Sequence, residues 1–120
     1  MAENGSRVKV TRSFDTLIVE FADRKILDEL CIAEIQDELV RLVDGTPDVK
    51  LILSFGNVEH LSSAALGMLI TLNKKVHGKS GALKLCDIKP QILEVFNITR
   101  LNKMFDIQPD LAAAKAGFQA

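Results

Sequence analysis

Tryptophan and tyrosine are absent from this chain of 120 residues, whose aromatic side chains are six phenylalanines. Their absence removes the stacking platform that many nucleic-acid and sugar sites use. Cysteine is also scarce, because Cys31 and Cys86 form no C-x-x-C pair and only two histidines accompany them. We therefore expect two buried thiols in a reducing compartment, with no metal site and no cofactor.

Long apolar runs are missing too. No run approaches the roughly 20 residues that a membrane-spanning helix needs, and the N-terminus lacks the apolar core of a signal peptide. Ala2 at the second position excludes myristoylation. The net charge is -1 without a dense basic stripe, which argues against nucleic acid as the main partner. The expected location is cytoplasmic, with neither nucleic acid nor a membrane as partner.

The composition that remains is typical of a globular protein, with 48% hydrophobic and 26% charged residues. A chain of this length is long enough for one hydrophobic core and therefore for one domain. We place that domain at residues 7–118. Residues 1–6 are polar, and we expect them to form a flexible N-terminal segment.

Two different apolar periods occur in the first third of the chain. Apolar residues alternate over residues 8–10 and 17–21, which is the period of a strand, and the short connection between them predicts a hairpin. Over residues 32–42 the apolar positions are spaced by three and four, which places them on one face of a helix. Asp28 is the expected N-cap of this helix.

The rest of the chain repeats a strand followed by a helix. We expect strands at residues 51–53, 83–86 and 104–107, and a helix after each, the second of which begins at Pro90. Gly78 is the expected left-handed cap of the first of these helices. This alternation implies right-handed crossovers and parallel strands, to which the hairpin adds an antiparallel edge. The expected fold is α/β, a single domain with a mixed, mostly parallel sheet and about four helices.

The loop between Phe55 and Ser63 is the candidate site. It follows an apolar strand and ends at a helix start, and sites in α/β sheets favour the loops beyond the carboxyl ends of strands. Ser62 and Ser63 are adjacent there, and either hydroxyl is suited to cap the helix. The functional alternative is phosphorylation, because a helix N-terminus tolerates the roughly -1.5 to -2 charges of a phosphate.

Catalytic motifs are missing from this loop. His60 and Ser63 are close in sequence, but no G-x-S-x-G elbow surrounds the serine and no third group is placed to orient the histidine. The phosphate-binding patterns G-x-x-x-x-G-K-[ST] and G-x-G-x-x-G do not occur either. We therefore predict a protein without catalytic residues, in which His60 is an exposed loop residue or part of a contact surface.

The segment from Leu51 to Ile107 resembles the STAS domain, the family named for sulphate transporters and anti-sigma factor antagonists. The core motif of that family is an apolar strand, then D-S-S-G-L-G, then an apolar helix, and it is matched here by S-S-A-A-L-G from Ser62 to Gly67. A second family stretch, similar to L-T-G-L-x-x-L-F, is matched by N-I-T-R-L-N-K-M-F at residues 97–105. The expected order of elements also looks like the STAS fold.

The resemblance implies a small bacterial regulator of transcription that acts by binding proteins. Free-standing family members bind an anti-sigma factor that is also a serine kinase, and this binding releases a sigma factor. The kinase phosphorylates the first serine after the motif aspartate, which separates the complex, and a serine phosphatase restores it. By position, that serine is Ser63 here. The implied partner-binding residues are His60, Leu61, Ser62, Ser63, Ala64 and Gly67.

Three departures from the family motifs bear on this expectation. Ser62 replaces the aspartate, Ala64 replaces the second serine, and Arg100 replaces the glycine of the later stretch. A kinase that recognises the aspartate would lose a charge-assisted contact worth roughly 1.5–3 kcal/mol. Ser62 is therefore the alternative phosphorylation site. The alternative function is a non-phosphorylated STAS scaffold in a multi-protein signalling complex, with other STAS proteins as partners.

Overall fold

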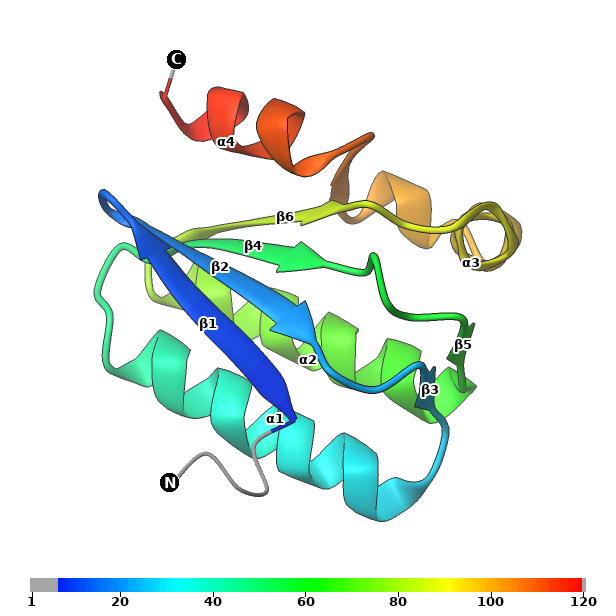
Figure 1. The fold of residues 1–120 in the computed structure, drawn as a ribbon. Helices are drawn as coiled ribbons and strands as arrows, with labels where there is room; N and C mark the ends of the chain where they lie inside the picture. The colour runs from blue at the N-terminus through cyan, green and yellow to red at the C-terminus, as the bar shows by residue number, and fades with distance from the viewer. Residues whose placement is uncertain (1–6, 120) are drawn as a thin grey trace.

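Residues 7–119, the part of the chain that the computed structural model describes, form seven strands and four α-helices (Figure 1). The strands are β1 (Val8–Ser13), β2 (Thr16–Phe21), β3 (Lys25–Ile26), β4 (Lys50–Ser54), β5 (His60–Leu61), β6 (Ala82–Cys86) and β7 (Asp106–Gln108). The helices are α1 (Glu29–Asp44), α2 (Ser63–Gly78), α3 (Pro90–Ile98) and α4 (Leu111–Gln119), with the 3-10 turn η1 (Leu101–Lys103). The segment expected to be flexible, residues 1–6, lies outside the described residues.

The central sheet has five strands in the order β1-β2-β4-β6-β7. β1 and β2 are antiparallel, with Val8 opposite Phe21 and Ser13 opposite Thr16, so a two-residue turn joins them. The pairs β2–β4, β4–β6 and β6–β7 are parallel. The expected mixed, mostly parallel sheet with an antiparallel edge hairpin is confirmed.

Helices cover the two faces of this sheet unequally. α1 and α2 lie side by side on one face, and α4 lies on the other (Figure 1). The side of α1 and α2 holds the larger core, which includes the fully buried rings of Phe21, Phe55 and Phe96. Because β4 is covered on both faces, its continuous apolar run of Leu51, Ile52 and Leu53 is completely buried.

The predicted cap residue is confirmed at the start of α1, but the predicted cap at the end of α2 was wrong. Asp28 is the N-cap of α1, and its carboxylate accepts a hydrogen bond from the Cys31 backbone N–H at 3.1 Å. Gly78 is the last helical residue of α2 and not its cap, and a positive φ of 61° falls on Ser80. The reason is that the backbone N–H groups of Lys79 and Ser80 still bond to carbonyls of the last helical turn.

The last strand begins later than its apolar residues indicate. The expected strand at residues 104–107 is replaced by η1 followed by β7, which starts at Asp106. Phe105 is buried and packs edge-on against Phe96, with ring centroids 5.9 Å apart. Its apolar side chain therefore belongs to the core beneath α3 and does not mark a strand.

Candidate functional site

The candidate loop leaves the carboxyl end of β4 and is held by contacts to neighbouring strands. The Phe55 backbone N–H donates to the Cys86 carbonyl at 3.0 Å, and the Asn57 side chain donates to the Phe21 carbonyl at 3.2 Å. Val58, at the middle of the loop, is fully buried. These contacts give the loop one path across the carboxyl end of the sheet.

A small second sheet directly precedes α2. β5 pairs in parallel with β3, with Lys25 opposite His60 and Ile26 opposite Leu61. The Ser62 backbone N–H continues the ladder by donating to the Ile26 carbonyl at 3.1 Å. Sequence reasoning missed this sheet because strands of two residues are too short to show alternation. His60 is exposed, as expected for a loop residue, but it lies in a strand and not in a loop.

The two serines at the start of α2 have different surroundings. Ser62 is the N-cap, with extended backbone angles, and its Oγ accepts a hydrogen bond from the Ala65 backbone N–H at 3.2 Å. Ser63 is the first helical residue and is exposed. Its hydroxyl makes no hydrogen bond with any residue in the range 7–119. The capping role therefore falls to Ser62, and the Ser63 hydroxyl is left available.

Small exposed residues extend the surface around Ser63 along the first turns of α2. Ala64 and Gly67 are exposed, whereas Ala65 and Leu66 point into the core. A Cβ atom added at Gly67 would meet no atom within 4 Å, so the packing of the fold does not require a glycine there. Another protein can therefore approach the backbone of α2 closely on this side.

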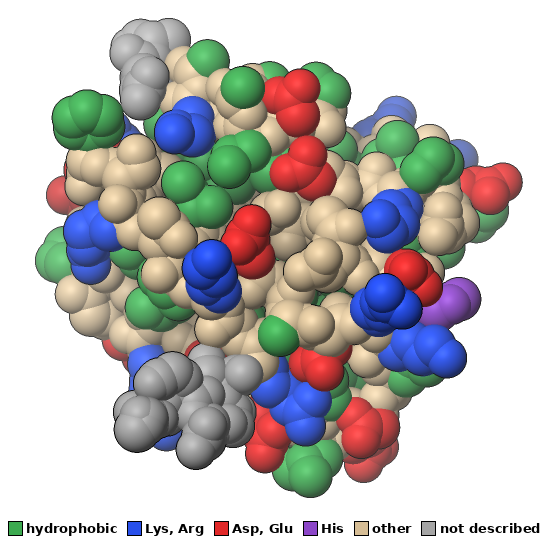
Figure 2. All heavy atoms as spheres, viewed as in Figure 1, with side chains coloured by type: hydrophobic (Ala, Val, Ile, Leu, Met, Phe, Trp, Pro, Cys, Tyr) green, Lys and Arg blue, Asp and Glu red, His purple; other side chains and the backbone are tan. Residues whose placement is uncertain are grey.

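The charge around this surface is uneven. Arg24, Lys25 and His60 are exposed along β3 and β5, with the half-buried Glu59 beside them. Figure 2 shows a histidine together with Lys and Arg side chains at the right of the view, over these two strands. The first turn of α2 contains no acidic residue, whereas that of α1 contains Glu29. The start of α2 therefore suits a negatively charged group.

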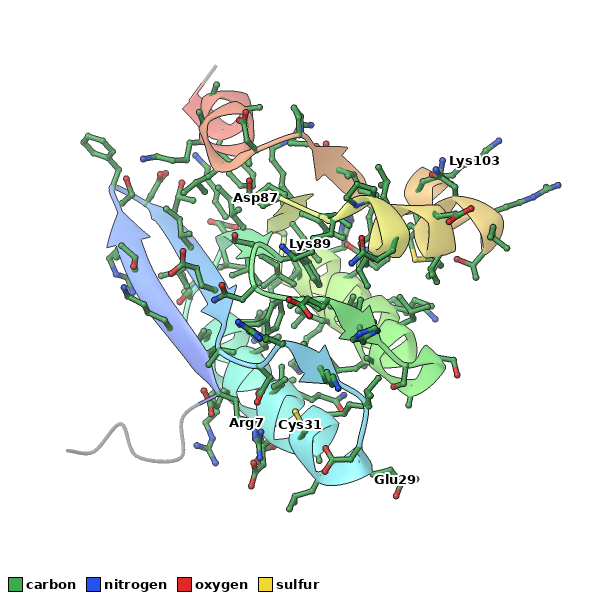
Figure 3. The ribbon with its side chains drawn as sticks, turned by 45° about the vertical axis from the view of Figure 1, so that its right-hand side comes forward. Arg7, Glu29, Cys31, Asp87, Lys89 and Lys103 are labelled. Carbon is green, nitrogen blue, oxygen red and sulfur yellow. The ribbon has the colours of Figure 1, made fainter. Side chains whose placement is uncertain are left out.

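A second polar cluster lies at the carboxyl ends of β4 and β6 (Figure 3). The Ser54 hydroxyl and the Cys86 thiol both donate to the Asp87 carboxylate, at 3.1 and 3.4 Å. Lys89 Nζ donates to the Gly56 carbonyl at 2.8 Å. Burial, reinforced by the charge of Asp87, raises the pKa of Cys86 to about 12, so this thiol is not a nucleophile at neutral pH. The cluster holds the loop in place.

A third cluster joins the start of β1 to α1, where Arg7 and Cys31 are labelled in Figure 3. Arg7 Nε donates to Glu34 at 2.6 Å, and its Nη1 donates to Asp23 at 3.1 Å. These hydrogen bonds raise the pKa of Arg7 above its ordinary value. Burial, together with the nearby Asp23, raises the pKa of Cys31. Both cysteines are free and buried, as the sequence indicates.

Two features are absent from residues 7–119. In that range no group of three or more His, Cys, Asp and Glu side chains is arranged to hold a metal ion. None of the helices there has the length and apolar character needed to cross a membrane.

The STAS domain family matches residues 8–114. BtrV of Bordetella bronchiseptica, provisionally named an anti-sigma factor antagonist, is 30% identical over 86 residues, 72% of this chain and 73% of that protein. The anti-sigma-B factor antagonist of Bacillus subtilis is 28% identical over 85 residues, 71% and 73% of the two chains. An anti-sigma-factor antagonist (STAS) domain structure from Planctomyces limnophilus has a TM-score of 0.86 at 17% identity, covering 94% of this chain and 98% of the other. Fold, motifs and family match agree, and the chain belongs to the STAS domain family.

Proposed function

We propose that this chain is an anti-sigma factor antagonist that binds an anti-sigma factor with serine kinase activity, and that phosphorylation of Ser63 ends this binding. The observation that carries the proposal is the difference between two adjacent serines. The Ser62 hydroxyl is engaged as the cap of α2, whereas the Ser63 hydroxyl is exposed at the helix N-terminus. The names of the two curated relatives support the antagonist role.

The phosphoryl transfer requires only an acceptor from this chain. Ser63 Oγ forms a bond to the γ-phosphorus of ATP, the bond from that phosphorus to ADP breaks, and the hydroxyl proton leaves. The kinase supplies the metal ion and the groups that position the phosphates. A serine phosphatase reverses the change by hydrolysing the ester to serine and inorganic phosphate. The proposal therefore assigns no catalytic residue to this protein.

The added phosphate is expected to act on the complex and to leave the fold intact. The N-terminus of α2 combines backbone N–H groups, the positive end of the helix and a first turn without carboxylates. A phosphate at Ser63 is therefore compatible with the folded domain. It also projects from the surface of Ser63, Ala64 and Gly67, on which a partner would pack. The charge and bulk thus oppose docking at the centre of the contact.

Ser62 is the less suitable acceptor. Its side chain is partly buried, and its Oγ already accepts the Ala65 N–H. A kinase would have to withdraw this hydroxyl from the cap before reaction, and loss of an N-cap costs about 1 kcal/mol. Ser63 requires no such rearrangement, because its hydroxyl makes no hydrogen bond with the described residues.

Calorimetric titration of the host's anti-sigma factor kinase with variants of this chain tests the proposal. Ser63→Asp should weaken binding at least about 10-fold, a loss of about 1.4 kcal/mol, and Ser63→Ala should bind like wild type. Ser80→Asp is the matched control, because Ser80 is exposed just beyond the other end of α2. It adds the same charge away from the proposed surface and should bind like wild type.

Mass spectrometry after incubation with the kinase and ATP tests the acceptor separately. We expect phosphate on Ser63 in wild type and none in Ser63→Ala. The proposal is wrong if both Ser63 variants bind the kinase like wild type, or if Ser80→Asp weakens binding as much as Ser63→Asp. Phosphate on Ser62 in wild type would move the switch to the cap residue.

A further inference from the structure

The turn between β1 and β2 carries the most exposed large apolar side chain of the described residues. Phe14 is 88% exposed, and its φ of 56° lies in the left-handed region, which bulky residues rarely adopt. Two-residue hairpin turns usually place glycine, asparagine or aspartate at such positions. Folding within residues 7–119 therefore does not account for an aromatic side chain here, and the ring is exposed for contact with another molecule.

An open apolar hollow lies beside the same hairpin. It has a volume of about 220 Å³ and is lined by Val8 and Val10 of β1 and by Leu42 of α1, with Glu38 and Arg41 at its polar rim. Val10 is 41% exposed at this place. The hollow is a partly enclosed site for an apolar side chain from another molecule.

β1 is also an edge strand with backbone groups directed outward. The Ala22 N–H donates to the Arg7 carbonyl at 3.0 Å, and the register continues in pairs from Val8 opposite Phe21. Because hydrogen-bonded and non-hydrogen-bonded pairs alternate in antiparallel strands, Val10 and Arg12 direct their N–H and C=O groups away from β2. Such an edge is a template for another strand.

We propose that two copies of this chain associate through β1, as antiparallel neighbours about a twofold axis at Thr11. The two five-stranded sheets then form one continuous sheet. In this register Val10 of each copy lies opposite the partner's Arg12, so the outward backbone groups of both residues bond across the interface. Phe14 of each copy lies opposite the partner's Val8, at the partner's apolar hollow.

The side chains along this register are compatible. Thr11 faces its own counterpart, and Thr–Thr pairs are favourable across strands. Lys9 lies opposite Ser13, so no like charges are directly opposed. Arg12 shares the hollow's face of the strand with Val10, which directs it toward the polar rim of the partner's hollow, where Glu38 and Arg41 lie. The interface thus repeats the same contacts on both sides of the axis, as a twofold dimer requires.

The dimer surface is separate from the phosphorylation surface. β1 is one lateral edge of the central sheet, whereas Ser63 follows β5 at the carboxyl end, and Figure 1 shows the hairpin turn and β5 on opposite sides of the molecule. Pairing through β1 therefore leaves the start of α2 accessible in both copies. The dimer is expected whether or not Ser63 is phosphorylated.

Light scattering during size-exclusion chromatography measures the association directly. Wild type should elute with twice the chain mass of 13.2 kDa, and dilution should shift it toward the monomer. Phe14→Ser, which removes the anchor, and Val10→Lys, which adds a charge at the edge, should each raise the dimer dissociation constant at least about 30-fold. Ile98→Ser is the matched control: Ile98 is 74% exposed on α3, and its loss should leave the dimer intact.

Disulfide trapping tests the register. Thr11→Cys places two thiols in a non-hydrogen-bonded pair with Cα atoms about 4.5 Å apart, which is close enough for a disulfide. Lys9→Cys is the control, because its two copies lie about 14 Å apart along the strands. The native cysteines do not interfere, since both are buried.

Mild oxidation should cross-link Thr11→Cys and not Lys9→Cys, as read on a non-reducing gel. A wild type that stays monomeric across the concentration series overturns the proposal. So does a dimer that Ile98→Ser weakens as much as Phe14→Ser, or equal cross-linking of the two cysteine variants. Circular dichroism of each variant confirms that loss of the dimer is not loss of the fold.

Discussion

α1 and α2 begin next to each other, each following a strand of the β3–β5 pair, yet their first turns differ in charge. α1 is capped by the carboxylate of Asp28 and carries Glu29 in its first turn. α2 is capped by the neutral Ser62 and has no acidic residue there. A helix N-terminus carries the equivalent of about half a positive charge. The chain neutralises this charge itself at α1 and leaves it for an external anion at α2.

The reactive side chains in the two first turns differ as well. Cys31 is 3% exposed, and its thiol donates to Asp23 at 3.5 Å. Ser63 is exposed, and its hydroxyl has no partner among residues 7–119. Helix N-termini normally lower the pKa of a thiol, but burial raises the pKa of Cys31. Burial, more than position at a helix start, therefore decides which of these groups can react.

Replacing the Ser63 hydroxyl with a thiol should give the largest effect, on the rate of chemical modification. Ser63→Cys places a thiol at an exposed helix N-terminus, where its pKa is lowered, so iodoacetamide should modify it at least about 100-fold faster than Cys31 at neutral pH. Peptide mass spectrometry of a single time course reports both rates, which makes Cys31 the internal control. Equal rates would show that the two helix starts do not differ in accessibility.

Raising the pH should act on the buried thiols and on neither serine. Cys86 ionises near pH 9.0 when unfolded, and burial raises its folded-state pKa to about 12, while the pKa of Cys31 rises in the same direction. Between these values the folded protein holds a proton that the unfolded chain has lost. Titration of the thiols should therefore leave the free energy of unfolding unchanged below pH 9.0 and lower it above that value, by up to about 1.4 kcal/mol per pH unit for each thiol.

Urea denaturation over a pH series measures this loss. Cys86→Ala should reduce the slope of the free energy of unfolding against pH by the equivalent of about one proton, whatever its effect on stability at neutral pH. A variant with the wild-type slope would show that Cys86 does not titrate differently in the folded and unfolded states.

Removing each cap should show the difference in charge between the two helix starts. Asp28→Ala leaves the Cys31 N–H without its acceptor and removes a carboxylate from the α1 N-terminus, and we expect a loss of about 1–2 kcal/mol in the free energy of unfolding. Ser62→Ala removes only a neutral acceptor, at a cost of about 1 kcal/mol or less. Urea denaturation at low and high salt measures both. Salt should reduce the Asp28 effect and leave the Ser62 effect unchanged, and the reverse would contradict the assignment.

The smallest effect is expected at Gly67. Gly67→Ala should raise the free energy of unfolding by about 0.5–1 kcal/mol, because alanine restricts the unfolded chain and favours the helix. A Cβ atom has open space at this position. Thermal or urea denaturation measures the gain, and a destabilised variant would reveal a contact that the open space does not show.

The sequence predicted local structure well and contacts across the chain poorly. Alternation at residues 17–21 and helical spacing at residues 32–42 indicated β2 and α1, and Asp28 was identified as a cap, because these signals lie within a few neighbouring residues. The β3–β5 pair was missed, because its strands are 34 residues or more apart and only two residues long. Gly78 was wrongly predicted as the cap of α2 because the helix hydrogen bonds continue past it.

By itself the sequence determined the α/β order of elements, the edge hairpin, the two buried thiols and the likeness to the STAS domain. Which serine caps α2 and which is exposed could be seen only in the folded protein, where the Ser62 N–H bonds to the distant Ile26 carbonyl and the Ser62 hydroxyl accepts the Ala65 N–H. Tertiary packing likewise places β1 at the edge of the central sheet, beside a hollow completed by α1. Periodicity is a property of neighbours along the chain, whereas accessibility is set by residues that folding brings together from far apart.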